Sequence, residues 1–337
     1  MGSLAVGVLG LGLGRHHVAW YAGCCDVGRL VICDPNAERV RDVRAAHPQV
    51  AAAYPSLEEM LAAERLDAIS ITTPDHLHRP HAVRCLEAGC HVLLAKPIAT
   101  TLPDARAIIA AAEAGSRRLM VAHERRLRVS SLAIKEHLDR GALGRIIHLS
   151  MDSIQDKREQ FRRAPWYASP EAGRSAIVGS GIHQVDLVLY LVGEPVASVM
   201  AYANRLGDMA FPKDKTTAAL FSFPSGAIGQ VTVTYEAHWP PSHRVDGHAF
   251  RLIGTRGVIM GDRMAVDGVD AWTEIPETEN PLVTGVLGCI AAFVDALLHD
   301  APMPITGRDA YESLAAALAA DESAATGRAV VPERAEF

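Results

Sequence analysis

The first third of the chain alternates between strand-like and helix-like patterns, and this alternation restricts the fold more than any other feature. β-rich apolar runs that we interpret as strands lie at 4–12, 29–34, 66–74, 90–97 and 118–124. Segments with a helical spacing of apolar residues lie among them, at 17–24, 36–47, 56–64, 79–89 and 102–115. This order predicts an α/β fold whose parallel sheet is covered by helices on both faces. Ligands bind such sheets at the carboxyl ends of the strands, near the point where the strand order reverses.

The pattern changes near residue 124. A helix is predicted over 130–144, and a strongly apolar helix over 182–193. Several strand-like runs follow, joined by hairpin-like turns. We therefore predict two domains, a parallel-sheet domain at 1–123 and an α+β domain with an open, largely antiparallel sheet at 124–337. Helices can cover only one face of that second sheet, so we expect a like subunit to cover the other, in a homodimer or homotetramer.

Composition argues against several kinds of partner. The chain has 337 residues and a formal net charge of −6 at pH 7, which argues against nucleic acid or an anionic membrane surface. No apolar stretch approaches the ~20 residues that span a bilayer, and the N-terminus lacks the basic region of a signal peptide. We therefore expect a cytoplasmic protein. The six cysteines form no C-x-x-C pair, which fits reduced thiols.

The segment GLGLGRHH links the first strand to the first helix. Gly10 permits a tight turn, and Gly12 lets backbone N–H groups approach a pyrophosphate at the positive end of the helix. The third glycine of the usual G-x-G-x-x-G pattern is displaced, because Arg15 stands at its position and the glycine is Gly14. A tight turn without a ligand is the alternative interpretation. The strand–helix–strand context favours a dinucleotide-binding Rossmann domain.

Asp34 supports this interpretation. It ends the second predicted strand, 20 residues beyond Gly14, where an acidic side chain binds ribose hydroxyls. Its negative charge would repel a 2′-phosphate, so we expect NAD as the cofactor and regard NADP as less favoured. Arg39 and Arg41 could favour a phosphate, but they lie on the following helix and are interpreted as surface residues.

Three histidines in DHLHRPH have a spacing that resembles a zinc site. They are His76, His78 and His81. The segment opens a helix directly after a strand that should face the cofactor, and no second cluster of ligands accompanies it. We therefore predict no metal site.

A second candidate for chemistry lies in GIHQVDLVLYLVG. His183 and Asp186 are three residues apart and share one helix face. A paired carboxylate can fix the tautomer of a histidine, as general acid–base catalysis requires. The alternative is a core helix whose histidine forms only a local hydrogen bond.

Several of these motifs together resemble the Gfo/Idh/MocA oxidoreductase family. The similar stretches include VGVLGLGLGRHH, ICDPNAERV, DAISITTPDHLH, CLEAGCHVLLAKP, GALGRIIHLS and GIHQVDLVLYLVG, in the family's order. The resemblance covers nearly the whole chain. Members are NAD(P)-dependent dehydrogenases and reductases that act mainly on sugars and cyclitols. It implies a Rossmann domain followed by a domain with an open, largely antiparallel sheet.

The resemblance also implies roles by position. Lys96 matches the lysine of a Glu-Lys-Pro motif that touches the nicotinamide ribose and the reacting hydroxyl; taken alone, it would be a strand-end lysine reaching for water. Lys96 and His183 are therefore expected to be catalytic. The residues expected to bind the cofactor are Gly10, Gly12, Leu13, Gly14, Arg15, Asp34, Thr72, Thr73, Pro74, His78, Lys96 and Pro97. Those expected to bind the substrate are Lys96, Arg126, Trp166, Tyr167, His183, Asp186 and Tyr235.

Two positions depart from the family pattern. Ala95 stands where the family commonly has a glutamate, and Gly179 stands at the acid of its Asp-x-Gly-x-His motif. The proton relay must therefore differ from the usual one. Tyr235, His238 and His243 are candidates to supply the missing polar group.

We interpret the chain as an oxidoreductase that moves a hydride between NAD and a hydroxyl or keto carbon of a sugar, cyclitol or related polyol. Lys96 and His183 would handle the proton. Two alternatives remain open. One is an NAD-requiring glycosidase that acts by transient oxidation, and the other is a non-catalytic NAD-binding regulator.

Overall fold

The structure is a computed structural model that describes residues 3–239 and 250–335. The chain divides into two compact units, Met1–His123 with Val286–Tyr311, and Glu124–Gly285 with Glu312–Phe337. Residues 286–311, which we assigned to the second domain from the sequence, belong to the first unit. They return to it because the segment before Thr306 pairs with β6, where Val121 N–H donates to Ile305 and Met120 forms a bridge with Thr306.

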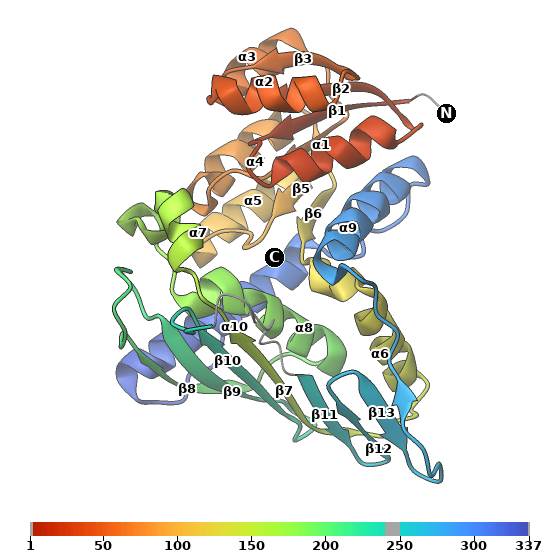
Figure 1. Ribbon diagram of the computed structural model, residues 1–337, viewed down its shortest axis with the longest axis vertical. Coiled ribbons are helices and arrows are strands. Elements are labelled where there is room, and N and C mark those ends of the chain that lie inside the picture. The colour runs from red at the N-terminus through yellow and green to blue at the C-terminus, as the bar shows by residue number, and fades with distance from the viewer. Residues whose placement is uncertain (1–2, 240–249, 336–337) are drawn as a thin grey trace. The chain divides into compact units, whose positions relative to one another are not determined.

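The first unit is built on a six-stranded parallel sheet in the order β3-β2-β1-β4-β5-β6 (Figure 1). Its strands are β1 Leu4–Leu9, β2 Val27–Cys33, β3 Val50–Tyr54, β4 Ala68–Ile71, β5 His91–Ala95 and β6 Leu119–Ala122. β3 was not predicted, because its three consecutive alanines give a weak strand signal. The strand order reverses between β1 and β4, so the carboxyl ends of these two strands border the crevice where such sheets bind ligands.

Helices flank this sheet as the alternating sequence pattern predicts. They are α1 Gly14–Gly23, α2 Ala37–Ala46, α3 Leu57–Ala63, α4 His78–Glu87 and α5 Leu102–Ala114. Side chains cap several helix starts, which satisfies N–H groups that have no partner inside the helix. Ser56 accepts from the N–H of Glu59 and donates to its carboxylate, forming a capping box at α3. Every residue of β4 is buried, as expected for a strand covered on both faces.

The second unit contains an eight-stranded sheet in the order β14-β13-β12-β11-β7-β10-β9-β8. Its strands are β7 Ile146–Ile154, β8 Ser198–Asn204, β9 Thr216–Ser222, β10 Ile228–Thr234, β11 Phe250–Gly254, β12 Gly257–Met260, β13 Arg263–Val266 and β14 Thr273–Glu274. β7 and β10 are parallel, and the other neighbouring pairs of these strands are antiparallel. The predicted fold class, a Rossmann sheet followed by a largely antiparallel sheet, is confirmed.

Helices of the second unit cover one face of its sheet (Figure 1). The remaining helices are α6 Val129–Asp139, α7 Arg158–Arg163, α8 Ile182–Val192, α9 Pro281–Leu298 and α10 Gly307–Thr326, the last two crossing between units. A π-helical turn at Ile177–Gly181 leads into α8. Gly229 of β10 allows α8 to approach closely, since a Cβ there would lie 2.8 Å from Val188. Side chains alternate along β9, with one face buried and the other exposed.

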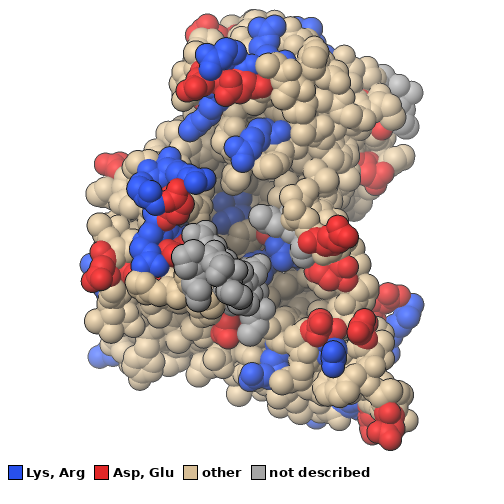
Figure 2. All heavy atoms as spheres, in the orientation of Figure 1, with Lys and Arg blue, Asp and Glu red and all other residues tan. Residues whose placement is uncertain are grey.

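No helix in the described part of the chain is both long and apolar enough to cross a membrane. On the face drawn in Figure 2, acidic and basic side chains lie interspersed.

Candidate active site

In the first unit, the turn after β1 has a conformation that only glycine adopts readily. Gly10 has a φ of +87°, and a Cβ there would lie 3.0 Å from the Thr72 backbone. The Thr72 hydroxyl donates to the Gly10 carbonyl at 2.6 Å. The carboxyl ends of β1 and β4 are therefore joined where the strand order reverses.

The next two glycines have different surroundings. Around Gly12, no atom lies within 4 Å of the position of a Cβ, which leaves room for a phosphate group to approach the backbone. At Gly14, a Cβ would lie 2.6 Å from the Thr72 hydroxyl and 3.0 Å from Val8. Close helix–sheet packing is the usual role of the third glycine in this motif. Gly14 takes that role one residue early, and Arg15 is exposed.

Asp34 lies at the end of β2 and is buried. Its Oδ2 accepts the Leu11 N–H at 2.7 Å and its Oδ1 accepts the Asn36 N–H at 2.8 Å. A carboxylate has about four acceptor positions, so two remain for hydroxyl groups. Arg39, interpreted from the sequence as a surface residue, is half exposed, but its NH1 lies 3.6 Å from Asp34 Oδ2.

His78 links the loops that follow β4 and β5. It is completely buried, and its ring nitrogens lie 3.0 Å from the Thr73 carbonyl and 2.8 Å from the Pro97 carbonyl. His81 lies 3.0 Å from the Thr73 hydroxyl. Within residues 3–239 and 250–335, no group of three or more His, Cys, Asp or Glu residues is arranged to hold a metal ion. Half-buried Lys96 directly follows β5, next to the loop that His78 fixes.

In the second unit, His183 lies beside a buried carboxylate. His183 is on the first turn of α8, and its Nδ1 is 2.9 Å from Oε2 of Glu124. Burial alone would raise the pKa of the Glu124 carboxyl, but the positive charges of His183, Arg125 and Arg128 outweigh it and hold that pKa well below its usual range. Glu124 was not predicted from the sequence. Glu124 lies two residues after the end of β6, and its partner is distant in the chain, so its position near a strand end was the only signal.

Asp186, predicted to pair with His183, is bound by other groups. Arg126 binds both of its oxygens, at 2.8 and 2.7 Å, and Ser313 donates to it at 2.9 Å. Asp186 is fully buried, and the Arg126 guanidinium also lies over the Tyr190 ring. The carboxylate that the structure places 2.9 Å from His183 Nδ1 is thus Glu124. For Arg126 and Asp186, contact with a substrate stays a prediction.

Gly179 lies in the π-helical turn, one helical turn before His183. A Cβ there would lie 2.6 Å from the Tyr235 hydroxyl and 3.2 Å from Arg174 Nε. The Tyr235 hydroxyl is also 3.4 Å from the Ala176 carbonyl. Tyr235 and Arg174 therefore occupy the space that a side chain at position 179 would need. Of the two candidates within the described residues, Tyr235 and His238, Tyr235 is the one that lies at this position.

Aromatic side chains surround these groups. The Trp166 and Tyr167 rings stack with centroids 3.9 Å apart. The Arg174 guanidinium lies 5.1 Å from the Trp166 centroid and 4.8 Å from the Tyr167 centroid. Phe161 stacks on Tyr167 and meets Tyr235 edge to face. The two aromatic residues predicted to contact the substrate thus lie beside a buried cation.

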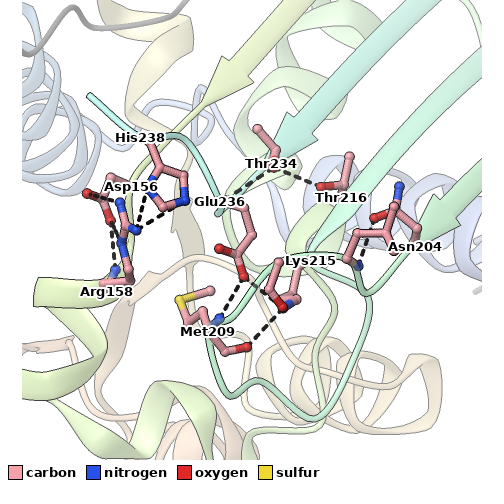
Figure 3. Close-up of polar contacts among 11 residues, drawn as sticks. Asp156, Arg158, Asn204, Met209, Lys215, Thr216, Thr234, Glu236 and His238 are labelled. Carbon is pink, nitrogen blue, oxygen red and sulfur yellow. Dashed lines mark hydrogen bonds and ion pairs between the residues drawn. The ribbon is translucent and has the colours of Figure 1, made fainter. Parts of the chain in front are cut away.

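Two polar groups beside Tyr235 hold the surrounding loops (Figure 3). Lys215 Nζ donates to the carbonyls of Gly207 and Met209 at 2.7 and 3.0 Å, and it lies 2.7 Å from Glu236 Oε1. Since Glu236 directly follows Tyr235, this contact fastens loop 205–214 to the end of β10.

The second group centres on Arg158, which binds both oxygens of Asp156 and donates to His238 Nδ1 at 2.8 Å (Figure 3). His238 therefore lies in this group, away from the contacts made at Gly179. His243 lies outside the described residues.

Comparisons with known proteins agree with this arrangement. The model "Oxidoreductase family, NAD-binding Rossmann fold" matches residues 4–123, and the model "GFO/IDH/MocA C-terminal domain" matches residues 131–260. The 1,5-anhydro-D-fructose reductase of Ensifer adhaerens is 27% identical over 281 residues, 81% of this chain and 82% of the relative. The D-apiose dehydrogenase of Paraburkholderia graminis is 26% identical over 334 residues, 94% of this chain and 86% of the relative. For some other relatives, the matched part is between 51% and 62% of their length.

Solved structures show the same fold over the whole chain. The WlbA dehydrogenase of Bordetella pertussis, in complex with NADH and UDP-GlcNAcA, is 27% identical with a TM-score of 0.84, and the match covers 99% of this chain and 100% of that one. Several solved relatives contain NAD or NADH. Fold and site together define an NAD-binding oxidoreductase with a Rossmann sheet. The chain belongs to the Gfo/Idh/MocA oxidoreductase family.

Proposed function

We propose that this protein is an NAD-dependent dehydrogenase or reductase of a sugar, cyclitol or related polyol, in which Lys96 and His183 handle the hydroxyl proton. The observation that carries the proposal is the contact between His183 and the buried Glu124 carboxylate. A histidine beside a fixed carboxylate is held in one orientation and can accept and return a proton. The substrate class is supported by relatives whose names include inositol, levoglucosan and D-apiose dehydrogenases.

The first unit has the groups that would hold NAD. Gly12 leaves the backbone of the turn accessible, and α1 begins directly after the turn, so the positive end of a helix would face the pyrophosphate. The two remaining acceptor positions of Asp34 would take the ribose hydroxyls. When bound, NAD supplies the hydride acceptor at its nicotinamide ring.

Proton transfer would be carried by residues of the chain itself. Glu124 lies at the Nδ1 side of His183, and Nε2 is the nitrogen that we propose for the substrate hydroxyl. Lys96 would contribute an ammonium group that stabilises negative charge on the reacting oxygen. The carbonyl of Pro97, the residue after Lys96, lies 2.8 Å from His78 Nδ1, and this contact holds the backbone next to the lysine.

The proposal is tested by a screen of sugars, cyclitols and polyols with NAD and NADP, followed by the absorbance of NADH. We expect turnover with at least one compound and faster turnover with NAD. Cleavage of a nitrophenyl glycoside without accumulation of NADH would instead indicate the glycosidase. Tight binding of NAD with no turnover of any compound would indicate the regulator.

We further propose a homodimer or homotetramer formed through the uncovered face of the eight-stranded sheet. The exposed apolar side chains on this face are Tyr202, Leu220, Ile228 and Met260. The strand registers place them on the same side of the sheet. Light scattering at micromolar concentration should give a dimer or tetramer, which Leu220→Glu weakens and Val269→Glu, on an exposed loop, does not. A monomeric wild type contradicts this proposal.

A further inference from the structure

Three consecutive residues of the 3₁₀ helix η2, Glu124–Leu127, contact residues in the first two turns of α8, against which η2 packs. The pairs follow one another in the same order along both helices, and they are Glu124 with His183, Arg125 with Gln184, and Arg126 with Asp186. Apart from His183, these side chains are buried. Little water competes for the contacts, so their geometry is well defined.

The first and third pairs are almost equally spaced along the two helices. Arg126 follows Glu124 by two residues, which rise about 4 Å in a 3₁₀ helix. Asp186 follows His183 by three residues, which rise about 4.5 Å in an α-helix. Both pairs can therefore form at once, and a shift of one helix along the other by one residue would break both.

The pair of Arg126 and Asp186 has the most contacts of the three. Nε and NH2 of Arg126 donate to the two carboxylate oxygens at 2.8 and 2.7 Å, and Ser313 of α10 donates to the same carboxylate at 2.9 Å. The Tyr190 ring, one turn further along α8, has its centroid 5.1 Å from Cζ of Arg126. A buried pair with two parallel hydrogen bonds fixes both the position and the orientation of its partners.

Gln184 connects the middle pair to the π-helical turn before α8. With the amide oriented so that each of its atoms meets a partner, its oxygen accepts from NH1 and NH2 of Arg125 at 3.3 and 3.2 Å, and its nitrogen donates to the Ser180 carbonyl at 3.1 Å. Ser180 lies in this irregular turn. Gln184 thus holds both η2 and the start of the helix that carries His183.

Glu124 meets His183 through one oxygen only, Oε2 at 2.9 Å. Its other oxygen lies 3.4 Å from NH2 of Arg128, and the charge of Arg125 also acts on the carboxylate. A single contact constrains the geometry less than a bidentate pair does. The alignment of Glu124 with His183 therefore depends on how η2 is held against α8.

We propose that Arg126 and Asp186 are positioning residues, which hold η2 against α8 so that the Glu124 carboxylate stays at Nδ1 of His183. They act on proton transfer through Glu124, and not through contact with the substrate. The competing account is the substrate contact that the family resemblance implies for these two residues. The inference deepens the proposed function and rests on it for the catalytic role of His183.

Arg126→Lys tests the inference, because it keeps the charge and removes the parallel donors. NMR of protein without substrate, assigned with His183→Gln, measures the pH at which the His183 ring loses its proton. We expect this midpoint to move to lower pH, since the carboxylate is no longer held at the ring. We also expect kcat to fall roughly tenfold and KM to change less than about threefold. An unmoved midpoint overturns the inference.

The double variant of Arg126→Lys and Glu124→Gln separates positioning from substrate binding. If Arg126 acts through Glu124, Arg126→Lys has no further effect once the carboxylate is gone. A raised KM, or an equal loss of kcat with and without the carboxylate, assigns Arg126 to the substrate and overturns the inference. Arg29→Lys is the matched control, because Arg29 binds both oxygens of buried Glu64 in the first unit. It should leave kcat and the midpoint unchanged.

A second variant decides if Arg126→Lys does not fold. Arg126→Met combined with Asp186→Leu removes the pair without leaving a buried charge, and such replacements commonly preserve stability. The same lower midpoint and reduced kcat are expected. Values like those of the wild type overturn the inference.

The titration also separates this inference from the proposed function, because it needs no substrate. A lower midpoint in Arg126→Lys, without turnover of any compound by the wild type, supports the positioning role and refutes the dehydrogenase. Turnover by the wild type with an unmoved midpoint in the variant does the reverse. If the midpoint stays and no compound is turned over, both are wrong.

Discussion

His183 Nδ1 lies 2.9 Å from Glu124 Oε2, and both residues belong to the second unit. The carboxylate favours a protonated imidazole, because the two opposite charges attract where little water screens them. Glu124→Gln removes the charge and nearly preserves the shape. We expect kcat to fall by roughly 10–100-fold with KM changed little, since substituting such a supporting group has effects of this size.

The pH profile of the same variant distinguishes an electrostatic role from a structural one. Without the carboxylate, His183 loses its proton at lower pH, so the acidic limb of kcat for alcohol oxidation should move to lower pH. Glu136→Gln serves as the control, since Glu136 forms only an exposed pair with Arg140. If Glu124→Gln leaves kcat and its pH profile unchanged, Glu124 does not support the proton transfer by His183.

We expect the cofactor preference to depend on Asp34. We expect NAD to bind about tenfold or more tightly than NADP, because the carboxylate would accept from ribose hydroxyls and would repel a 2′-phosphate. Asp34→Ser should narrow the difference mainly by weakening NAD. Arg39 lies 3.6 Å from Asp34, so it becomes available to a phosphate in that variant, and Arg39→Ala should restore part of the preference. Calorimetric titration checks each case, and equal or tighter NADP binding by wild type contradicts the role of Asp34.

Gly179 cannot be replaced without cost. Gly179→Ala places a methyl group 2.6 Å from the Tyr235 hydroxyl, so we expect a loss of roughly 1–3 kcal/mol in the free energy of unfolding. Tyr235→Phe removes the clashing oxygen, and adding it to Gly179→Ala should therefore recover part of the loss. Gly23→Ala is the control, because nothing lies within 4 Å of a Cβ there. Strictly additive effects in denaturant unfolding would show that the two residues do not meet.

Asp321 on α10 should make the free energy of unfolding depend on pH. Burial raises the pKa of its carboxyl to about 6, against a hydrogen bond from Ser175 that lowers it. In unfolded chains the pKa of an aspartate carboxyl is about 3.9. The neutral carboxyl therefore stabilises the folded protein fully below about pH 4, and this contribution is lost as the pH rises through about 6. Asp321→Asn should therefore stabilise the protein by roughly 1–3 kcal/mol at pH 8 and little at pH 4.

Thermal unfolding at both pH values measures this effect. Glu322→Gln, at the neighbouring exposed position, should have no such dependence. Equal changes at pH 4 and pH 8 in Asp321→Asn would mean that the carboxyl titrates normally.

Local features of the sequence predict the strands and helices of the first unit well. Contacts between residues far apart in the chain could not be predicted. The Rossmann order follows from a repeated local pattern, and Asp34 follows from its distance to the glycine turn. The sequence alone does not show that Gly14 takes the role of the third glycine. That role follows from its close approach to Thr72, a residue at the end of β4. Likewise, a helical pattern cannot reveal which sheet it packs on, so residues 286–311 were assigned to the wrong unit.

The polar partners in the second unit could not be predicted for the same reason. Sequence spacing favoured Asp186 as the partner of His183, because residues three apart share a helix face. Asp186 instead pairs with Arg126, whose guanidinium donates to both carboxylate oxygens. Glu124 and Tyr235 reach the site from β6 and β10, and no local pattern connects these strands to α8.

The central claim is that Lys96 acts on the proton of a sugar or polyol hydroxyl while NAD accepts the hydride. It is tested most directly by comparing Lys96→Met with wild type, measuring NAD affinity by calorimetry and turnover by NADH absorbance with the best compound from the screen. We predict that NAD affinity stays within a few-fold and that turnover falls by roughly 10²–10⁴. Unchanged turnover in Lys96→Met would return Lys96 to the role of a strand-end lysine that reaches for water, and it would contradict the account.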